Sequence, residues 1–205
     1  MRIWCIRQNR MKRKIAEWSR WLHIYLSMFS FVIVLFFAVT GLTLNHLDWF
    51  PEKESLEEVD GKLDASWVNG SDTTLVKKME IVELFRSKYG VNGLLNDFRI
   101  DETEVSVSFQ GPGYTADVFI DRSKGTFHLT ERSLGFVAWI NDLHKGRDTG
   151  QGWKWVIDFS AIFMSLISLT GIILLLYLKK KRLNGIIWLI AGVALVVLLY
   201  FFTGL

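Results

Sequence analysis

The most constraining feature of the sequence is a long apolar segment near its start. No charged residue occurs between Arg20 and Asp48. A helix that crosses the hydrocarbon core of a bilayer needs about 20 mostly apolar residues, so residues 22–47 are long enough to span it. The segment is longer than the apolar region of a cleavable signal peptide, and no small-residue cleavage site precedes Asp48. We therefore predict a permanent membrane span.

Two further uncharged segments predict two more spans. They cover residues 159–178 and 183–205. The segment between the first two spans is about a hundred residues long, the size of one small domain. We predict a tail at residues 1–21, a first span at 22–47 and a soluble domain at 48–153. A second span at 154–178, a loop at 179–184 and a third span at 185–205 follow.

The charged residues are distributed in a way that predicts the orientation of the spans. The first 20 residues hold seven basic residues and one acidic residue, and residues 179–182 are all basic. Residues 47–153 hold 19 acidic and 12 basic residues, a net charge of −7. Basic loops stay in the cytoplasm, so we expect the tail and the 179–184 loop inside and the soluble domain outside.

In a bacterium this orientation places the protein in the inner membrane. The N-terminus would be cytoplasmic, and the soluble domain and the C-terminus would be periplasmic. The lipid bilayer is then a partner of all three spans. Topology accounts for the basic tail more simply than nucleic-acid binding does, so we expect no nucleic-acid partner.

The soluble segment shows a helical pattern followed by strand patterns. Apolar residues at helical spacing predict one helix over residues 74–89, with an N-cap within residues 71–74. Its apolar stripe comprises Leu75, Met79, Val82 and Phe85, with Leu84 beside it. Alternating apolar and polar residues predict four short antiparallel strands, at residues 98–100, 105–109, 116–120 and 126–130.

The flanks of this helix-and-strand unit have different patterns. Residues 52–70 are acidic and poorly periodic, which predicts a loop or a short strand. Residues 134–144 are amphipathic, with Phe136, Val137, Ile140 and Leu143 on one side, and Gly146 suits a C-terminal cap. The fold class is therefore an α-helical membrane part of three spans with a small α+β domain between the first two.

Four histidines are the candidates for binding chemistry: His23, His46, His128 and His144. His23 and His46 stand near the two ends of the first span, 23 residues apart, or roughly 35 Å in a straight helix. His46 and His144 are both expected at the outer membrane face. Two neutral imidazoles there can bind a haem iron axially, and such a haem transfers electrons rather than binding substrate.

Other roles fit the same histidines. Amphipathic rings are tolerated at the depth of the lipid headgroups, so His23, His46 and His144 also suit a purely interfacial role. His128 lies in a predicted strand and is expected to be an ordinary surface histidine. Thr40-Gly41 near the outer end of the first span offers either a helix-packing notch or space for a flat ring. Thr170-Gly171 repeats the pair near the inner end of the second span.

The cysteine and motif content narrows the cofactor classes. The single cysteine, Cys5, lies in the tail. The soluble domain therefore has no disulfide and holds neither thiolate-ligated zinc nor an iron–sulfur cluster. No CxxCH motif is present, so a haem would be bound non-covalently. Walker, serine-elbow and HExxH motifs are also absent from the sequence.

Several segments resemble the PepSY-associated transmembrane protein family. The end of that family's first span is similar to residues 40–46, and its second-span signature is similar to residues 141–147, Gly152, and residues 158–159 and 169–171. The helix and strands between them are similar to a PepSY domain, which also occurs in propeptides of thermolysin-like peptidases. The resemblance covers residues 18–182 and implies a PepSY-like periplasmic domain inserted between spans 1 and 2.

Larger relatives in this family include membrane haem proteins that reduce ferric siderophores in the periplasm. The resemblance therefore implies haem b with His46 and His144 as iron ligands, and His23 as a further cofactor-binding candidate. Arg147 would pair with a haem propionate, because its guanidinium fits a carboxylate bidentately. Asp158 would either orient a ligand histidine or cap the second span.

This chain departs from those relatives in having three spans and few histidines. A second bis-histidine haem would need a homodimer that pairs two copies of His23 near a two-fold axis. The alternative function belongs to another class: a non-enzymatic module whose periplasmic domain binds a peptide, protease or partner protein, anchored by the spans. Electron transfer to a ferric siderophore and protein binding thus imply different partners.

Fusions to alkaline phosphatase test the predicted topology. The enzyme needs disulfides that form in the periplasm and not in the cytoplasm. A fusion after Gly113 should be active and a fusion after Arg182 should be inactive, with enzyme activity in intact cells as the measurement. The reverse pattern would overturn the orientation.

Overall fold

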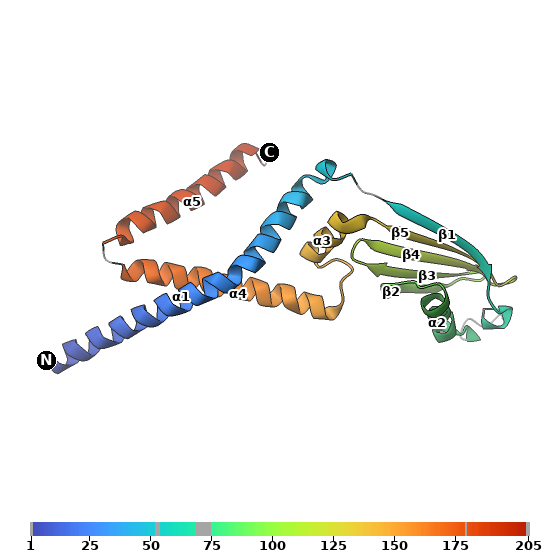
Figure 1. Cartoon of the computed structure of the whole chain (residues 1–205), viewed down its shortest axis with the longest axis horizontal. Coiled ribbons are helices and arrows are strands. Elements are labelled where there is room, and N and C mark those ends of the chain that lie inside the picture. The colour runs from blue at the N-terminus through green and yellow to red at the C-terminus, as the bar shows by residue number, and fades with distance from the viewer. Residues whose placement is uncertain (1, 52–53, 69–74, 179, 204–205) are drawn as a thin grey trace. The chain divides into compact units, whose positions relative to one another are not determined.

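The computed structural model describes residues 2–51, 54–68, 75–178 and 180–203, with side chains in these ranges except for residues 2–13, 15 and 16. The main elements, shown in Figure 1, are in chain order α1 Arg2–Asn45, β1 Ser55–Lys62, α2 Lys78–Lys88, β2 Leu94–Ile100, β3 Glu104–Gly111, β4 Tyr114–Asp121, β5 Thr126–Ser133, α3 Gly135–Lys145, α4 Gln151–Tyr177 and α5 Arg182–Thr203. A 3₁₀ turn, η1 Leu47–Trp49, follows α1, and another, η2 Ala65–Trp67, follows β1. Residues 35–158 form one compact unit, and the residues before and after them form a second.

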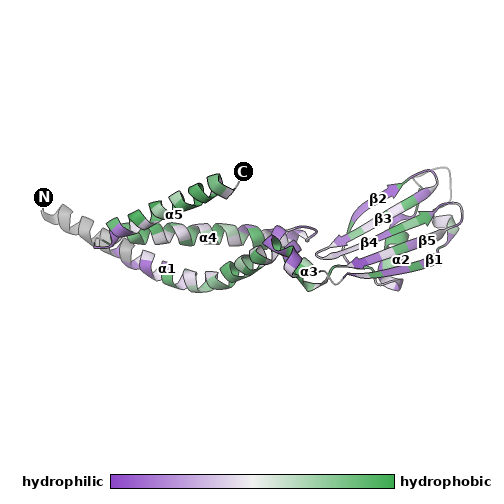
Figure 2. Ribbon diagram, turned by 90° about the horizontal axis from the view of Figure 1, so that it is seen from above, coloured by the Kyte–Doolittle hydropathy of each residue, from purple (hydrophilic) through white to green (hydrophobic). Residues whose placement is uncertain are grey.

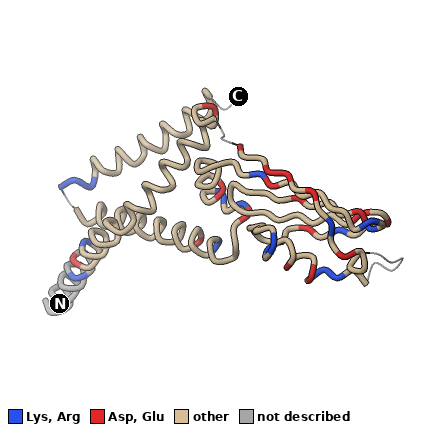
Figure 3. Tube along the Cα trace, turned by 45° about the vertical axis from the view of Figure 1, so that its right-hand side comes forward, with Lys and Arg blue, Asp and Glu red and all other residues tan. Residues whose placement is uncertain are grey.

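In the described part of the chain, three helical segments are long and apolar enough to cross a membrane: Glu17–Asn45, Gln151–Tyr177 and Arg182–Thr203. Figure 2 shows apolar residues along most of α4 and α5, whereas the strands mix both classes. Charged residues are rare along these helices, and basic residues gather at the turn between α4 and α5 (Figure 3). Three apolar helices are therefore present as the sequence predicts. Lys179, in the predicted basic loop, lies outside the described residues.

The start of the chain is more regular than a tail. α1 is continuous from Arg2 to Asn45, so the segment predicted as a basic tail is helical from Arg2 onward. No proline or glycine precedes Gly41 in this helix to interrupt it. At the other end, α1 stops at Asn45, and η1 follows before Pro51.

The five strands form one antiparallel sheet in the order β1-β5-β4-β3-β2. Side chains alternate between its faces: in β3, Val105, Val107 and Phe109 are buried, and the residues between them are half-buried. Figure 1 shows α2 against one face of the sheet. The buried core comprises alternate side chains of β3, β4 and β5, Ile81 and Phe85 of α2, and four connecting residues: Leu63, Val68, Val76 and Val91.

The four predicted strands are present and longer than expected, and β1 is a fifth. It pairs with β5 from Ser55 opposite Ser133 to Lys62 opposite Thr126. Seven of its eight residues are exposed, so no apolar alternation marks it. Gly61 is the half-buried exception, and a Cβ there would collide with the Phe127 ring. An acidic edge strand of this kind is held by its backbone ladder rather than by burial.

The helix predicted at residues 74–89 is present as α2, but it is shorter than predicted and buries a different side. It begins at Lys78, with Lys77 at the N-cap, and the N-cap predicted within residues 71–74 lies outside the described residues. Phe85 is fully buried as predicted, and Ile81 one turn earlier is buried beside it. Leu75 and Met79, predicted on the same stripe, are 67% and 77% exposed. Met79 is two residues from Ile81, which places it on the opposite side of the helix.

The amphipathic helix α3 ends as predicted at Gly146, whose φ of 66° is the left-handed conformation of a glycine cap. Its buried residues are polar, however: Asn141 and Asp142. Asp142 Oδ2 accepts a hydrogen bond from Gly113 N at 2.9 Å, and Leu134 N donates to Gly113 O at 2.9 Å. These bonds fasten α3 to the β3–β4 turn.

Gly113 is required at this turn. Its φ is 62°, and a Cβ on it would lie 2.8 Å from Trp139 N. Farther along, α4 begins at Gln151, seven residues before Asp158. The predicted role of Asp158 as a cap of the second span is therefore wrong, because an N-cap residue immediately precedes the first helical residue and Asp158 lies inside α4.

Truncating Phe85 should destabilise the sheet unit. Phe85→Ala removes a ring that packs edge-to-face on Phe127 at 5.0 Å, so we expect a loss of about 3–5 kcal/mol. Hydrogen exchange of amides in β3 and β4, measured on the full chain in detergent, should accelerate accordingly. Met79→Ala on the exposed side should leave exchange unchanged, and equal exchange in the two variants would contradict this core.

Candidate functional site: two histidines held by Thr-Gly pairs

His144, near the end of α3, lies against the Thr40-Gly41 pair of α1. Its Nδ1 is 2.6 Å from Thr40 Oγ1, and its ring meets the Phe37 ring edge-to-face with centroids 5.0 Å apart. A Cβ on Gly41 would lie 3.8 Å from His144 Cε1, an ordinary van der Waals contact. The small pair thus accommodates a flat ring, and that ring is an imidazole of the same chain.

The hydrogen bonds of Thr40 define which nitrogen of His144 carries the proton. A threonine hydroxyl has one proton, and Thr40 Oγ1 donates it to Phe36 O at 2.6 Å. The same oxygen also accepts a hydrogen bond when His144 carries its proton on Nδ1 and donates it to Thr40 Oγ1. Nε2 then carries the lone pair. Among the described residues none hydrogen-bonds Nε2, and Nε2 is not a buried atom.

His23, within the first span, has the same arrangement in the other compact unit. Its Nδ1 is 3.2 Å from Thr170 Oγ1 on α4, and Thr170 Oγ1 donates to Ile167 O at 2.8 Å. A Cβ on Gly171 would lie only 3.0 Å from His23 Cε1. The threonine again fixes the Nδ1–H tautomer, and the glycine makes room for the ring. Each Thr-Gly pair therefore holds one histidine.

His46 has different neighbours. Its ring stacks on Trp49 with centroids 3.9 Å apart and 8° between the planes, and its Nε2 is 3.4 Å from Asn45 Nδ2. Within the described part of the chain, none of its hydrogen bonds or ring contacts involves His144. Axial ligands lie on opposite sides of a haem and do not touch each other, so the pairing of His46 with His144 stays a prediction.

Arg147 follows α3 and is engaged by two carboxylates. Its Nε is 3.2 Å from Asp148 Oδ2 and 3.7 Å from Asp142 Oδ1, and its side chain is 61% exposed. Lys145 Nζ also approaches Asp142 Oδ1, at 3.4 Å. Arg147 is thus anchored through Nε near the end of α3, while most of its side chain remains exposed.

Sequence reasoning missed the polar residues that connect α1 and α3. Thr43, one turn after Thr40, lies with its Oγ1 2.6 Å from Asn141 Oδ1, and Asn141 is 2% exposed. Asn141 Nδ2 is a buried nitrogen without a partner among the described residues. The available signal was the spacing: Asn141 and His144 are three residues apart on α3, as are Thr43 and Thr40 on α1.

His128 lies at the surface, as predicted, with its side chain 44% exposed. The Asp60 carboxylate, 2.7 Å from Nδ1, raises the pKa of His128 above its ordinary value. The associated stabilisation is present at low pH and is lost as pH rises through the folded-state pKa. Within the described residues no group of three or more His, Cys, Asp or Glu side chains is placed to hold a metal ion, and a bis-histidine haem needs only two.

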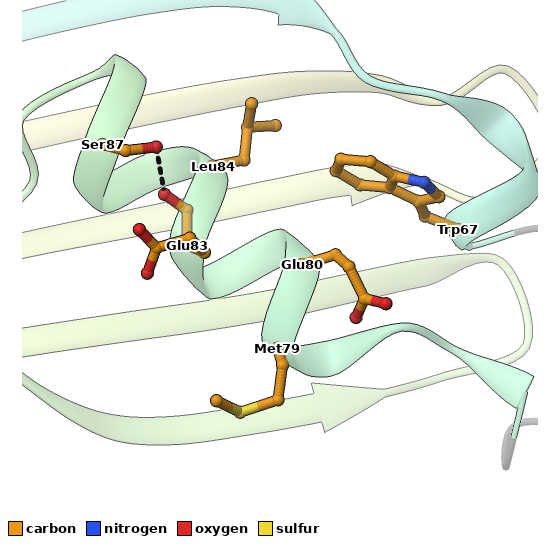
Figure 4. A pocket seen from close by; sticks show the side chains of 6 residues that line it. All are labelled: Trp67, Met79, Glu80, Glu83, Leu84 and Ser87. Atoms are coloured by element: carbon orange, nitrogen blue, oxygen red, sulfur yellow. Dashed lines mark hydrogen bonds between the residues drawn. The ribbon is translucent and has the colours of Figure 1, made fainter.

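A hollow on the sheet unit lies beside α2 (Figure 4). Trp67 and Leu84 supply apolar surface, and Glu80 and Glu83 supply carboxylates. The Ser87 hydroxyl donates to Glu83 O at 2.6 Å, so it is already engaged within the helix. The hollow is thus acidic and partly apolar, and it contains no histidine.

Alanine substitutions at glycine test whether Thr-Gly pairs make room for histidine. Gly→Ala in a helix interior ordinarily stabilises by about 1 kcal/mol. Gly192→Ala, where nothing lies within 4 Å of the new Cβ, should show this gain. Gly171→Ala should show a loss, because the His23 ring must move. Unfolding of the full chain by SDS, followed by circular dichroism, measures both, and equal gains would contradict the contact.

Comparison with known families agrees with the sequence resemblance. A model of the PepSY_TM-like family matches residues 17–203, which include all three apolar helices and the sheet. No curated protein and no solved structure matches the chain. The predicted family is confirmed: this chain is a membrane protein that belongs to the PepSY_TM-like family.

Proposed function

We propose that this protein holds non-covalent haem b and passes electrons toward the periplasm, with ferric iron in a siderophore as the acceptor. One observation carries the proposal: two histidines each have Nδ1 within hydrogen-bond distance of a threonine hydroxyl that itself donates to a helix carbonyl, which favours Nδ1–H as the donor, and no described residue bonds their Nε2. A ligating histidine usually donates its other ring N–H to an oxygen, which orients the ring and the lone pair. The haem iron would supply a one-electron couple.

His144 fits the role of an axial ligand. Its ring is fixed by Thr40, Gly41 and Phe37, so little side-chain freedom remains to be lost on binding. An imidazole lone pair without a partner is costly near hydrocarbon, where water does not replace it. A metal bond to Nε2 removes that cost.

His46 would supply the second axial bond from the end of α1. Its ring is held against Trp49 rather than by a hydrogen-bonded oxygen, so it is positioned by stacking. Arg147 would direct its exposed N–H groups to a haem propionate while Asp142 and Asp148 hold its Nε. His46, Arg147 and His144 all belong to the unit formed by residues 35–158.

The direction of transfer follows from the proposed orientation. The net charge of −7 over residues 47–153 and the basic turn after α4 favour a periplasmic PepSY-like domain inserted between the first two spans. His46 and His144 would then lie at the periplasmic face, within reach of an acceptor there. His23, in the first half of the first span, would lie nearer the cytoplasmic face.

Spectra of the purified protein test the ligands. His46→Ala or His144→Ala should each abolish the low-spin bis-histidine spectrum and the reduction of a ferric siderophore, because each removes one axial bond. His128→Ala is the control and should change neither, since that ring pairs with Asp60 on the sheet. A full bis-histidine spectrum in either ligand variant would refute the assignment.

The number of haems per protomer tests the role of His23. A dimer that pairs two copies of His23 would hold a second haem, so His23→Ala should reduce the haem count. Haem content per chain, from absorbance and protein mass, is the measurement. An unchanged count would show that His23 packs against Thr170 without ligating.

The second candidate function is an anchored binding module. The hollow beside α2, with Trp67, Leu84 and two carboxylates, favours a basic or apolar peptide segment as its partner. The colour of the protein separates the two functions. A Soret band that shifts on reduction with dithionite supports haem, and a colourless protein purified from haem-replete cells supports the module.

A further inference from the structure

The outer edge of β2 is an open edge of the sheet. β2 stands last in the strand order and pairs with β3, and among the described residues no strand covers its other side. Asp101 N donates to Glu104 O at 2.8 Å, which makes these two residues a hydrogen-bonded pair of the antiparallel ladder. Such pairs alternate with non-hydrogen-bonded pairs along two strands. Phe98 and Ile100 therefore direct their backbone N–H and C=O groups away from β3, toward the open edge.

The charged side chains on this edge are complementary to a second copy of themselves. Asp97 and Arg99 lie on the same face of β2, with Arg99 Nη2 3.4 Å from Asp97 Oδ2, and both side chains are more than half exposed. β2 contains no proline and no lysine, and it carries one charge of each sign. The other edge strand, β1, carries three acidic residues and one lysine, so two copies of β1 would repel each other. Charge thus protects the β1 edge from self-pairing and leaves the β2 edge open to it.

We propose that the β2 edges of two copies of this chain pair antiparallel about Phe98, which joins two five-stranded sheets into one. Phe98 then lies opposite Phe98 of the second copy, and their backbone groups exchange two hydrogen bonds. Asp97 lies opposite Arg99 of the second copy in a non-hydrogen-bonded pair, the kind in which facing side chains are closer. The two-fold axis repeats this ion pair, because an isologous interface makes every contact twice.

The charges also select this register over its neighbours. A register centred on Arg99 or on Asp97 places that residue opposite its own copy, and like charges directly opposite each other are destabilising. A register centred on Ile100 places Arg99 opposite a residue beyond the end of β2. The β-bulge in the first half of β2 interrupts the regular edge, and the register about Phe98 needs only residues 97–99, which follow the bulge.

The main body of α2 lies away from this edge. Phe85 of α2 packs on Phe127 of β5 at 5.0 Å, and β5 is three strands from β2, or about 14 Å at the usual strand spacing. The start of the helix is closer, with Lys78 Nζ 5.3 Å from the centre of the Phe98 ring. The middle of α2 therefore leaves the edge accessible to a second strand.

Charge reversal in the full chain tests this interface, with sedimentation velocity in detergent as the measure of self-association. Asp97→Arg and Arg99→Asp should each weaken association about tenfold, because both symmetry-related pairs change from attractive to repulsive. An equal mixture of the two variants should associate again, since a basic strand then faces an acidic one. Lys62→Asp, a charge reversal on the β1 edge strand, is the control and should leave association unchanged.

Cysteine cross-linking in isolated membranes tests the register, on a Cys5→Ser background. The Cα atoms of a non-hydrogen-bonded pair are about 4.5 Å apart, which a disulfide bridges, and two copies of one position would be about 8 Å apart, which it does not. Asp97→Cys and Arg99→Cys chains expressed together should therefore form a disulfide-linked dimer on oxidation. Either variant expressed alone should stay monomeric on a non-reducing gel.

Three outcomes would overturn the proposal. A monomeric wild-type protein would exclude self-pairing, and association that survives both charge reversals would place the interface elsewhere. Equal cross-linking of either cysteine variant by itself would exclude the register about Phe98. His23→Ala should change none of these results, so a failure of the proposed pairing of two His23 copies is distinguishable from a failure of the β2 interface.

Discussion

The hydrogen bond between His144 and Thr40 is the interaction on which the arrangement of residues 35–158 depends. The C-terminal part of α3 is fastened to the β3–β4 turn through Asp142 and Gly113. The same part of the helix meets α1 through His144 and Thr40, and through Asn141 and Thr43. The connection between sheet and first span is thus polar, and a polar bond shielded from water is both directional and costly to break. Directional bonds fix a helix in rotation as well as in distance, which an apolar contact alone does not.

The same arrangement, a threonine bonded to a histidine beside a glycine, occurs at His23 and Thr170, but its distances differ. Gly171 is close to the imidazole, and Gly41 is at ordinary contact distance. The Thr170 bond is longer than the Thr40 bond, 3.2 Å against 2.6 Å. The His144 ring is therefore positioned mainly by its hydrogen bond, and the His23 ring mainly by the shape of the groove. In both, the threonine donates its own proton to a helix carbonyl, so the tautomer of the histidine is set by α-helical geometry that the sequence already encodes.

The sequence was sufficient wherever a regular pattern was tied to burial. The three apolar helices, the alternating strands β3 to β5 and the buried Phe85 all follow from periodicity. The sequence predicted either a loop or a short strand where β1 lies. It did not decide between them because pairing with β5, rather than burial of its own side chains, stabilises β1. Thr40-Gly41 was interpreted as either a helix-packing notch or space for a flat ring, and a sequence alone does not say which ring fills such a space. Asn141 and Asp142 were missed because an amphipathic pattern was taken to bury its apolar side.

α3 does not follow that assumption. Its Phe136 and Trp139 are 70% and 44% exposed, and Asn141 and Asp142 are 2% and 5% exposed. In water such a helix would expose its apolar side to solvent and bury groups that prefer solvent. In the topology that we propose α3 would lie at the bilayer surface, where lipid would cover the apolar side, and the polar side has protein partners in Gly113 and Thr43. The exposure pattern of α3 is thus the one expected of an interfacial helix rather than of a helix on a soluble core.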